Sequence, residues 1–365
     1  MVMTCFYIFA FVLVLSFVVL VHEGGHFLVA RLCGVRVEEF SLGFGPEIFG
    51  RNDKKGTRWK ICMVPLGGYV KMLGDTDAAS AGSSVASLPE DQQRFAFISQ
   101  KLWKRAAIIF AGPATNYVFA ILILWFVLYF AGMMTMPAII SEVEEESAAA
   151  AAGLAVGDKI TAINGRSVDD FTDVQRAVRL QEFGKELLIQ FERDGRLMET
   201  SLVPKVMPDS DYPRIGVRSS VENMERRDDV GFIEALGVAC SQTWWMTSDT
   251  LSYLGQVLFH QRPPKEMRGP IGIAQAAGDA FQGGFTVLMV FIANISVAVG
   301  FMNLLPIPLL DGGHLALYLL EAIRRKPLTE KVQNALMWMG FSILMGLVGY
   351  TFFLDIPRVI QRIME

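Results

Sequence analysis

Charged residues and cysteines are both scarce in this sequence. Asp, Glu, Lys and Arg make up 19% of its 365 residues, the formal net charge is −4, and 52% of the residues are hydrophobic. A net negative charge argues against a nucleic-acid partner, and so apolar a composition is typical of a membrane protein with a soluble portion. The cysteines show no C-x-x-C spacing, which indicates neither a disulfide framework nor a cysteine zinc site. They are Cys5, Cys33, Cys62 and Cys240.

Histidine is as scarce as cysteine, yet two of the four histidines lie inside the first apolar run. The run extends from about Cys5 to Leu32 and has no Lys or Arg before Arg31, so it exceeds the roughly 20 residues that a membrane-spanning helix needs. It has neither a basic beginning nor a small-residue cleavage site, and we therefore expect a retained spanning helix rather than a signal peptide.

Within this run, the segment from His22 to His26 reads H-E-G-G-H. On a helix, His22 and His26 lie one turn apart on the same side and can bind one metal ion. Glu23 lies next to that side and can accept a proton from a metal-bound water. A single histidine on an apolar face is usually structural, but ionisable residues inside a span mark function. The complete pattern therefore predicts a zinc site.

The distribution of basic residues predicts the topology. Lys and Arg are absent before the first run and frequent after it, which places the N-terminus outside and the following loop in the cytoplasm. His22 precedes Arg31 by nine residues, or roughly 13 Å of helix, so the site lies below the cytoplasmic surface. The basic residues of this loop are Arg31, Arg36, Arg51, Lys54, Lys55, Arg58, Lys60 and Lys71.

Three further spans are expected at about 106–134, 283–305 and 334–354. The segment 232–260 is ambiguous, but a crossing there would put the basic residues 324–331 outside, so we expect it to lie on the outer membrane surface. Asn116 is polar at membrane depth in the second span, where it either hydrogen-bonds across helices or lines the site.

Two segments outside the spans predict β-structure. Residues 57–73 indicate two short strands around Pro65-Leu66-Gly67-Gly68, a hairpin that dips toward the membrane beside the metal. Residues 137–206 alternate strand and turn signals around one helix near 171–181 and resemble a PDZ domain of the bacterial periplasmic type. Such domains bind extended segments or chain ends by adding a strand to a sheet edge.

The third predicted span ends in N-L-L-P-I-P-L-L-D-G-G-H, residues 303–314. Its two prolines break the helix, and Asp311 follows on the cytoplasmic side, the side of His22 and His26. A catalytic zinc takes three protein ligands and a water, which makes Asp311 the best third ligand. As alternatives, Asp311 caps a helix, or His314 takes its place as ligand.

Together these segments resemble the site-two protease family of intramembrane metalloproteases, in particular the bacterial regulator of sigma-E protease branch. Two departures are visible: a single PDZ copy where the relatives carry two, and Gly24 where the motif commonly has a bulkier residue. The matching segments span nearly the whole chain. They are the His22–His26 motif, residues 65–70, 105–116 (RAAIIFAGPATN), the PDZ block, Gly269-Pro270-Ile271 and residues 303–313.

The resemblance implies Zn²⁺ on His22, His26 and Asp311, with Glu23 as the catalytic base. It implies that Asn303 and the hairpin around Gly67 and Gly68 hold the substrate, and Asn116 is a possible supporting residue. It also implies a bacterial inner-membrane protein with a periplasmic PDZ domain. The usual substrates are single-span proteins already trimmed outside, such as anti-sigma factors, and leftover signal peptides.

The predicted fold class is a polytopic α-helical membrane protein with four transmembrane helices, a membrane-associated β-hairpin and an inserted α+β PDZ domain. We expect two spans and the hairpin in residues 1–136, the PDZ domain in 137–206, a periplasmic connector with a surface helix in 207–282, and two spans with the Asp311 loop in 283–365. Two other functions stay open: a membrane zinc carrier, and a catalytically inactive zinc-binding scaffold that acts through its PDZ domain.

Overall fold

The structure is a computed structural model that describes residues 2–75, 88–181, 184–206, 213–220, 224–259, 269–326 and 329–364. The chain forms two compact units. One consists of residues 1–124 with 268–365, and the other of residues 125–267. The first unit contains all the predicted site residues. The second unit begins near the end of the second span and ends before the third.

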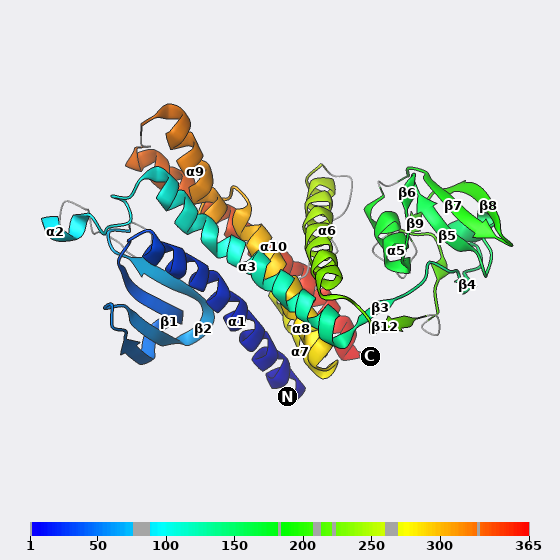
Figure 1. Ribbon diagram of the computed structural model, residues 1–365, viewed down its shortest axis with the longest axis horizontal. Coiled ribbons are helices and arrows are strands. Elements are labelled where there is room, and N and C mark those ends of the chain that lie inside the picture. The colour runs from blue at the N-terminus through cyan, green and yellow to red at the C-terminus, as the bar shows by residue number, and fades with distance from the viewer. Residues whose placement is uncertain are drawn as a thin grey trace. The chain divides into compact units, whose positions relative to one another are not determined.

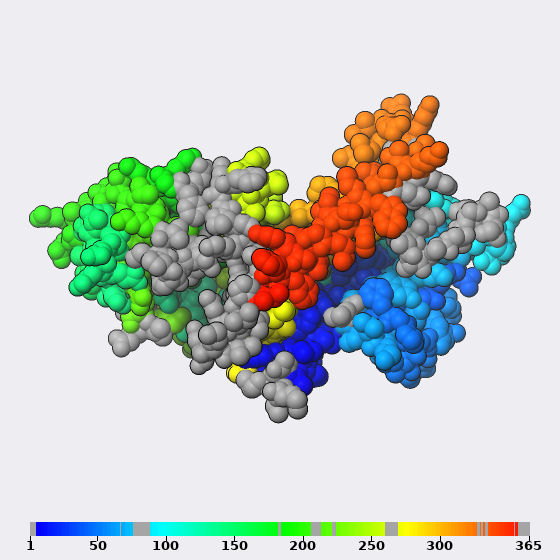
Figure 2. Space-filling model, turned by 180° about the vertical axis from the view of Figure 1, so that it is seen from behind, coloured from blue at the N-terminus to red at the C-terminus, as the bar shows by residue number. Residues whose placement is uncertain are grey.

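Among the residues that the structure describes, four helices are long and apolar enough to cross a membrane, which confirms the four-span prediction (Figure 1). The span in α10 has only 6% of its residues buried inside the protein, and Figure 2 shows this helix exposed on one face of its unit. Such exposure of an apolar helix fits contact with lipid. The four helices are α1 (Val2–Leu32), α3 (Leu102–Ala131), α8 (Phe285–Leu304) and α10 (Glu330–Met364).

Three shorter helices complete the first unit: α2 (Glu90–Gln93), α7 (Pro270–Gln282) and α9 (Asp311–Arg324). Helix α7 packs against α1, α8 and α10. Its first turn is tied to α10, because the backbone N–H groups of Gly269 and Gly272 donate to the buried carboxylate of Asp355 at 3.1 and 3.0 Å. A carboxylate there satisfies N–H groups that a helix start leaves unpaired.

The β-structure beside α1 differs from the predicted hairpin within 57–73. The structure has two long strands, β1 (Val37–Asn52) and β2 (Arg58–Met72), joined by the turn at 53–57. The two halves of β2 do not pair with each other, because β1 runs between them: Phe40 lies opposite both Val70 and Trp59. The Pro65–Gly68 segment is therefore a bend within one strand, with Gly67 at φ +95°.

The inserted unit has the predicted α+β PDZ-type architecture. Its main sheet has the antiparallel order β6-β5-β7-β8, and α5 (Phe171–Leu180) packs against it. A capping box of Asp170 and Asp173 starts α5. The strands are β5 (Lys159–Ile163), β6 (Arg166–Ser167), β7 (Leu187–Arg193) and β8 (Arg196–Leu202).

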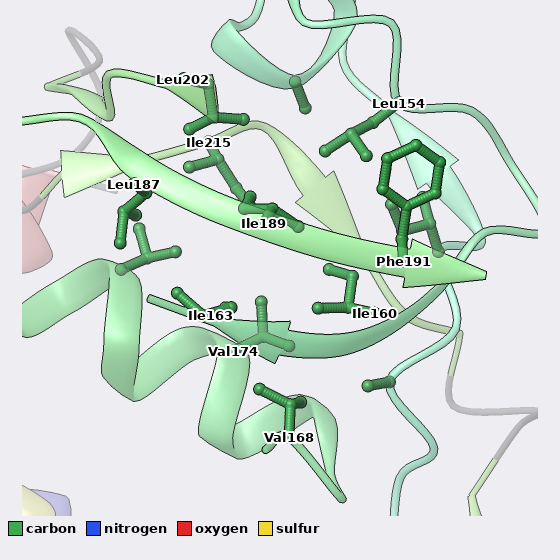
Figure 3. Close-up of a cluster of buried hydrophobic side chains, with 14 of the residues drawn as sticks. Leu154, Ile160, Ile163, Val168, Val174, Leu187, Ile189, Phe191, Leu202 and Ile215 are labelled. Atoms are coloured by element: carbon green, nitrogen blue, oxygen red, sulfur yellow. The ribbon is translucent and has the colours of Figure 1, made fainter. Parts of the chain in front are cut away.

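The hydrophobic core of this domain is formed by alternate residues of the strands and one face of α5 (Figure 3). Ile160, Ile189 and Val174 are at most 1% exposed. The packing reaches past residue 206, because Ile215 belongs to the same core and β11 (Val217–Arg218) pairs with β4 (Glu142–Val143). Residues 215–218 thus return to the first strand of the domain and complete its fold.

Short elements flank this core. They are α4 (Ala148–Ala151), the pair β9 (Lys205–Val206) and β10 (Pro213–Arg214), and the pair β3 (Met133–Thr135) and β12 (Glu225–Arg227). Helix α6 (Phe232–Leu258) follows them. Within the described part of the chain, α6 is not among the helices that qualify as spans, in agreement with the prediction that residues 232–260 do not cross the membrane.

Candidate metal centre

Helix α1 places His22 and His26 on one buried face. They are 7% and 6% exposed, and their Nε2 atoms lie 3.2 Å apart. The rings meet edge to face with centroids 4.8 Å apart. The i, i+4 spacing of a helix produces this juxtaposition, so two imidazole nitrogens point at one position.

Asp311, the first residue of α9, joins the pair. Its Oδ2 lies 3.1 Å from Nε2 of His22 and 3.5 Å from Nε2 of His26. In the described residues this is the one group of His, Cys, Asp and Glu side chains whose ligand atoms all lie within 4.8 Å of one another. His314, the alternative ligand, lies one turn further along α9 and is not in the group.

The three residues fit a metal ion. Oδ2 of Asp311 is buried without a hydrogen-bond partner, and an unsatisfied carboxylate oxygen is costly. A cation between the three atoms removes that cost. Two imidazole nitrogens and one carboxylate oxygen form a donor set that suits zinc and leaves a fourth position for water or substrate.

Helix α3 orients both imidazoles. Nδ1 of His26 lies 2.9 Å from the backbone carbonyl oxygen of Ile108. The carbonyl can only accept, so Nδ1 carries the proton and Nε2 is left as a metal ligand. Neither Ile108 nor its carbonyl was predicted from sequence, because a backbone acceptor on another helix has no local signature.

His22 is oriented by the side-chain amide of Asn116, which is fully buried. The amide nitrogen lies 3.2 Å from Nδ1 of His22, while Oδ1 is buried without a partner. Exchanging the amide nitrogen and oxygen makes Oδ1 accept from Nδ1–H of His22, which leaves Nε2 of His22 available for metal. This contact joins α3 to α1 and also lies at the candidate site, so it fits both roles left open for Asn116.

Glycines allow α3 to approach the site. A Cβ atom on Gly112 would lie 2.3 Å from Nε2 of His26 and 2.9 Å from Cε1 of His22. A Cβ on Gly25 would lie 2.5 Å from the carbonyl oxygen of Ala111. Any side chain at these positions collides with the histidines or the opposite helix. Gly112 was missed as a site residue; the signal was its place before Pro113 at the depth of the histidines.

The beginning of α9, where Asp311 lies, is packed as tightly as α3 is against the histidines. A Cβ on Gly312 would lie 2.3 Å from the carbonyl oxygen of Leu305, and a Cβ on Gly313 would lie 2.4 Å from that of Ile307. Asp311 is the first residue of α9 and Leu310 occupies the N-cap, with no side-chain cap hydrogen bond. The alternative in which Asp311 caps a helix is therefore wrong.

The other predicted site residues lie on the neighbouring elements. The bend of β2 reaches α1, since a Cβ on Gly68 would lie 3.3 Å from Cγ of Glu23. Gly67, next to it, lies against the ring of Phe44. Asn303 is half-buried in the last turn of α8. The structure thus brings Gly68 close to Glu23.

Fold and site together define a membrane-embedded zinc metalloprotease. The chain belongs to Peptidase family M50, whose model matches residues 10–347. Among its relatives, "Putative zinc metalloprotease Atu1380" of Agrobacterium fabrum is 38% identical, with 97% of this chain and 96% of the relative covered. "Metalloprotease MmpA" of Caulobacter vibrioides is 34% identical, with 94% of each chain covered.

Two solved structures of isolated domains resemble the inserted unit. One is the PDZ domain of an SdrC-like protein from Listeria monocytogenes, 17% identical, with a TM-score of 0.22 and with 24% of this chain and 90% of that chain covered. The other, from Listeria innocua, is 23% identical with a TM-score of 0.21 and covers 23% of this chain and 92% of that chain.

Proposed function

We propose that this metalloprotease hydrolyses peptide bonds inside the transmembrane segments of single-span membrane proteins. In this proposal His22, His26 and Asp311 bind the zinc ion, and Glu23 is the catalytic base. The observation that carries it is the position of the histidines. Both belong to the candidate span Cys5–Leu32 and are buried, which supports a site within the part of the molecule that crosses the membrane.

Glu23 moves the proton in the reaction. Bound zinc supplies Lewis-acid polarisation of the scissile carbonyl and acidifies water. Glu23 accepts a proton from the attacking water as the water oxygen bonds to the carbonyl carbon. The C–N bond then breaks, and Glu23 returns the proton to the leaving nitrogen. Ile108 and Asn116 keep the ligating nitrogens of both histidines unprotonated throughout.

The bend of β2 and Asn303 are proposed to hold the substrate. A helical substrate hides its carbonyl groups in backbone hydrogen bonds, so it must unwind before attack. The proximity of Gly68 to Glu23 supports this role for the bend. An extended segment beside Gly67 and Gly68 can add to an edge of the β1–β2 sheet, which fixes its backbone without reading its sequence.

We further propose a location and partners. The excess of Lys and Arg after α1 supports a bacterial inner-membrane protein with its N-terminus and PDZ domain in the periplasm and the active site near the cytoplasmic side. The PDZ domain binds a peptide segment or chain end. Substrates are proteins of the anti-sigma-factor type that have lost their outer domain, and remnants of signal peptides.

Mapping the cut tests this proposal. Purified full-length protein is incubated with a single-span substrate that carries a tag on each end, and mass spectrometry identifies the new termini. We expect both new termini within the apolar segment. Cuts confined to the flanking polar residues would contradict intramembrane cleavage. A control substrate with the same flanks and a water-soluble segment should stay intact.

A further inference from the structure

An ion pair outside the candidate active site joins α3 to α9. Nη2 of Arg105, in the first turn of α3, is 3.3 Å from Oε2 of Glu321 in α9, and the two side chains are 17% and 12% exposed. The Arg105 guanidinium also lies 4.9 Å from the centroid of the Tyr318 ring. Exposed pairs contribute little to stability, but loss of one partner from a pair this buried leaves an uncompensated charge.

Arg105 belongs to the face of α3 that orients the histidines. Ile108, Gly112 and Asn116 follow it at intervals of three, four and four residues, which places all four residues on one side of the helix. Ile108 contacts His26, Asn116 contacts His22, and Gly112 abuts both rings. One helical face thus positions the imidazoles and, at its end, binds α9.

The partner face of α9 carries the third ligand. Leu315, Tyr318 and Glu321 follow Asp311 at intervals of four, three and three residues. Leu315 and Tyr318 pack against the buried cluster that includes Ile108. Apolar packing of this kind is non-directional, whereas an arginine–carboxylate contact has a defined geometry. The ion pair is therefore suited to fix how far α9 lies along α3.

We propose that Arg105 and Glu321 are positioning residues for the metal site. By fixing the register of α9 on α3, their ion pair holds the Asp311 carboxylate beside His22 and His26. Glu321 lies ten residues from Asp311, about 15 Å along the helix, so neither partner touches the metal. This inference rests on the proposed role of Asp311 as a ligand.

The test measures metal binding by the full-length protein in detergent. The variants are Arg105→Glu, Glu321→Arg and the double charge exchange. Zinc affinity is measured by competition with a chelator, and the absorption spectrum of the cobalt-substituted protein reports ligand geometry. We expect each single variant to lose about tenfold or more in zinc affinity and to change the cobalt spectrum. The double variant should recover most of the zinc affinity and most of the wild-type cobalt spectrum.

A matched control separates positioning from general destabilisation. Asp158→Asn breaks the ion pair of Asp158 with Arg193 in the PDZ domain. It should lower the melting temperature and leave zinc affinity and the cobalt spectrum unchanged. Where a charge reversal prevents folding, the milder variants Glu321→Gln and Arg105→Lys are compared for zinc affinity instead. The neutral variant should weaken zinc binding more than the one that keeps the positive charge.

The outcomes distinguish this inference from the proposed function. Folded Arg105 and Glu321 variants with wild-type zinc affinity and cobalt spectrum overturn it. If Asp311→Asn loses zinc while those variants keep it, the positioning role alone fails. If Asp311→Asn itself keeps wild-type affinity and spectrum, the ligand assignment fails and the positioning role fails with it.

Discussion

At the scale of single residues, the site depends on a glycine that is not one of its ligands. Replacing Gly112 by alanine puts a methyl group where the histidine rings lie, 2.3 Å from Nε2 of His26. Because cores that are this closely packed do not absorb an added carbon without moving, we expect Gly112→Ala to lower zinc affinity by about tenfold or more. Competition with a chelator measures this loss of zinc affinity.

Gly24 provides the matched control for this substitution. It lies between the two histidines in sequence, yet a Cβ there would have nothing within 4 Å. Gly24→Ala should therefore keep its zinc, and it should stabilise α1 slightly, since alanine favours a helix by up to about 1 kcal/mol over glycine. Equal zinc affinity in the two alanine variants would contradict the close approach of α3.

The orientation of His22 gives a second prediction. Asn116→Leu removes the amide that contacts Nδ1 of His22, and we expect zinc affinity to fall by about 10–100-fold. Asn116→Asp keeps an oxygen that accepts from Nδ1–H and should retain most of the affinity. If the Asp variant folds but binds zinc as weakly as the Leu variant, the amide does not act as an acceptor.

The candidate site residues that sequence reasoning singled out differ in how they are encoded from the contacts that it missed. His22, Glu23 and His26 lie within one helical turn, so a local pattern suffices. Asp311 needed the topology of the whole chain in addition, because it lies beyond two further spans. The contacts of Gly112 and the Ile108 carbonyl are made between helices, and residue identity alone does not predict where a neighbouring helix passes.

At the scale of elements, β1 shows how a local turn signal misleads. The residues Pro65–Gly68 predict the turn of a hairpin, because Pro and Gly favour turns. The chain does bend there, but β1 pairs with both halves of β2. Pairing with a strand that lies outside residues 57–73 decides the sheet, and the local pattern of that segment does not include the distant partner.

The PDZ domain offers an element whose stability depends on pH. Burial alone would raise the pKa of the Asp158 carboxyl, but the two hydrogen bonds from Arg193, the backbone N–H of Ala155 and the charge of Arg193 outweigh burial and hold its pKa below the ordinary 3.8. The folded-state pKa is thus lower than the unfolded one. The pair therefore stabilises the domain above about pH 4, and its contribution is lost as the pH falls through the folded-state pKa.

Hydrogen exchange of full-length protein across the range from pH 3 to pH 7 measures this contribution through β7, which ends at Arg193. We expect protection of β7 to fall toward the acid end in the wild type. Asp158→Asn should show weaker protection at neutral pH and a flatter dependence. A variant with the same pH dependence as the wild type would show that other groups control the acid response.

At the scale of the whole molecule, the hydropathy of the sequence was sufficient to predict its candidate membrane spans. The four apolar runs coincide with α1, α3, α8 and α10, since a bilayer leaves few alternatives for such segments. The closing part of the PDZ-type domain was not predicted, because residues 215–218 are short and isolated. Their burial depends on a core formed by residues much earlier in the chain.

The central claim is that Glu23 performs proton transfer beside a zinc ion inside the membrane. The most direct test compares cleavage of a tagged single-span substrate by the wild type and by Glu23→Gln, with zinc content measured in both. We predict that both proteins hold equal zinc and that the variant is slower by a factor of about 10²–10⁴, the usual contribution of a general base. A Glu23→Gln protein that keeps its zinc and cuts at the wild-type rate would contradict the account.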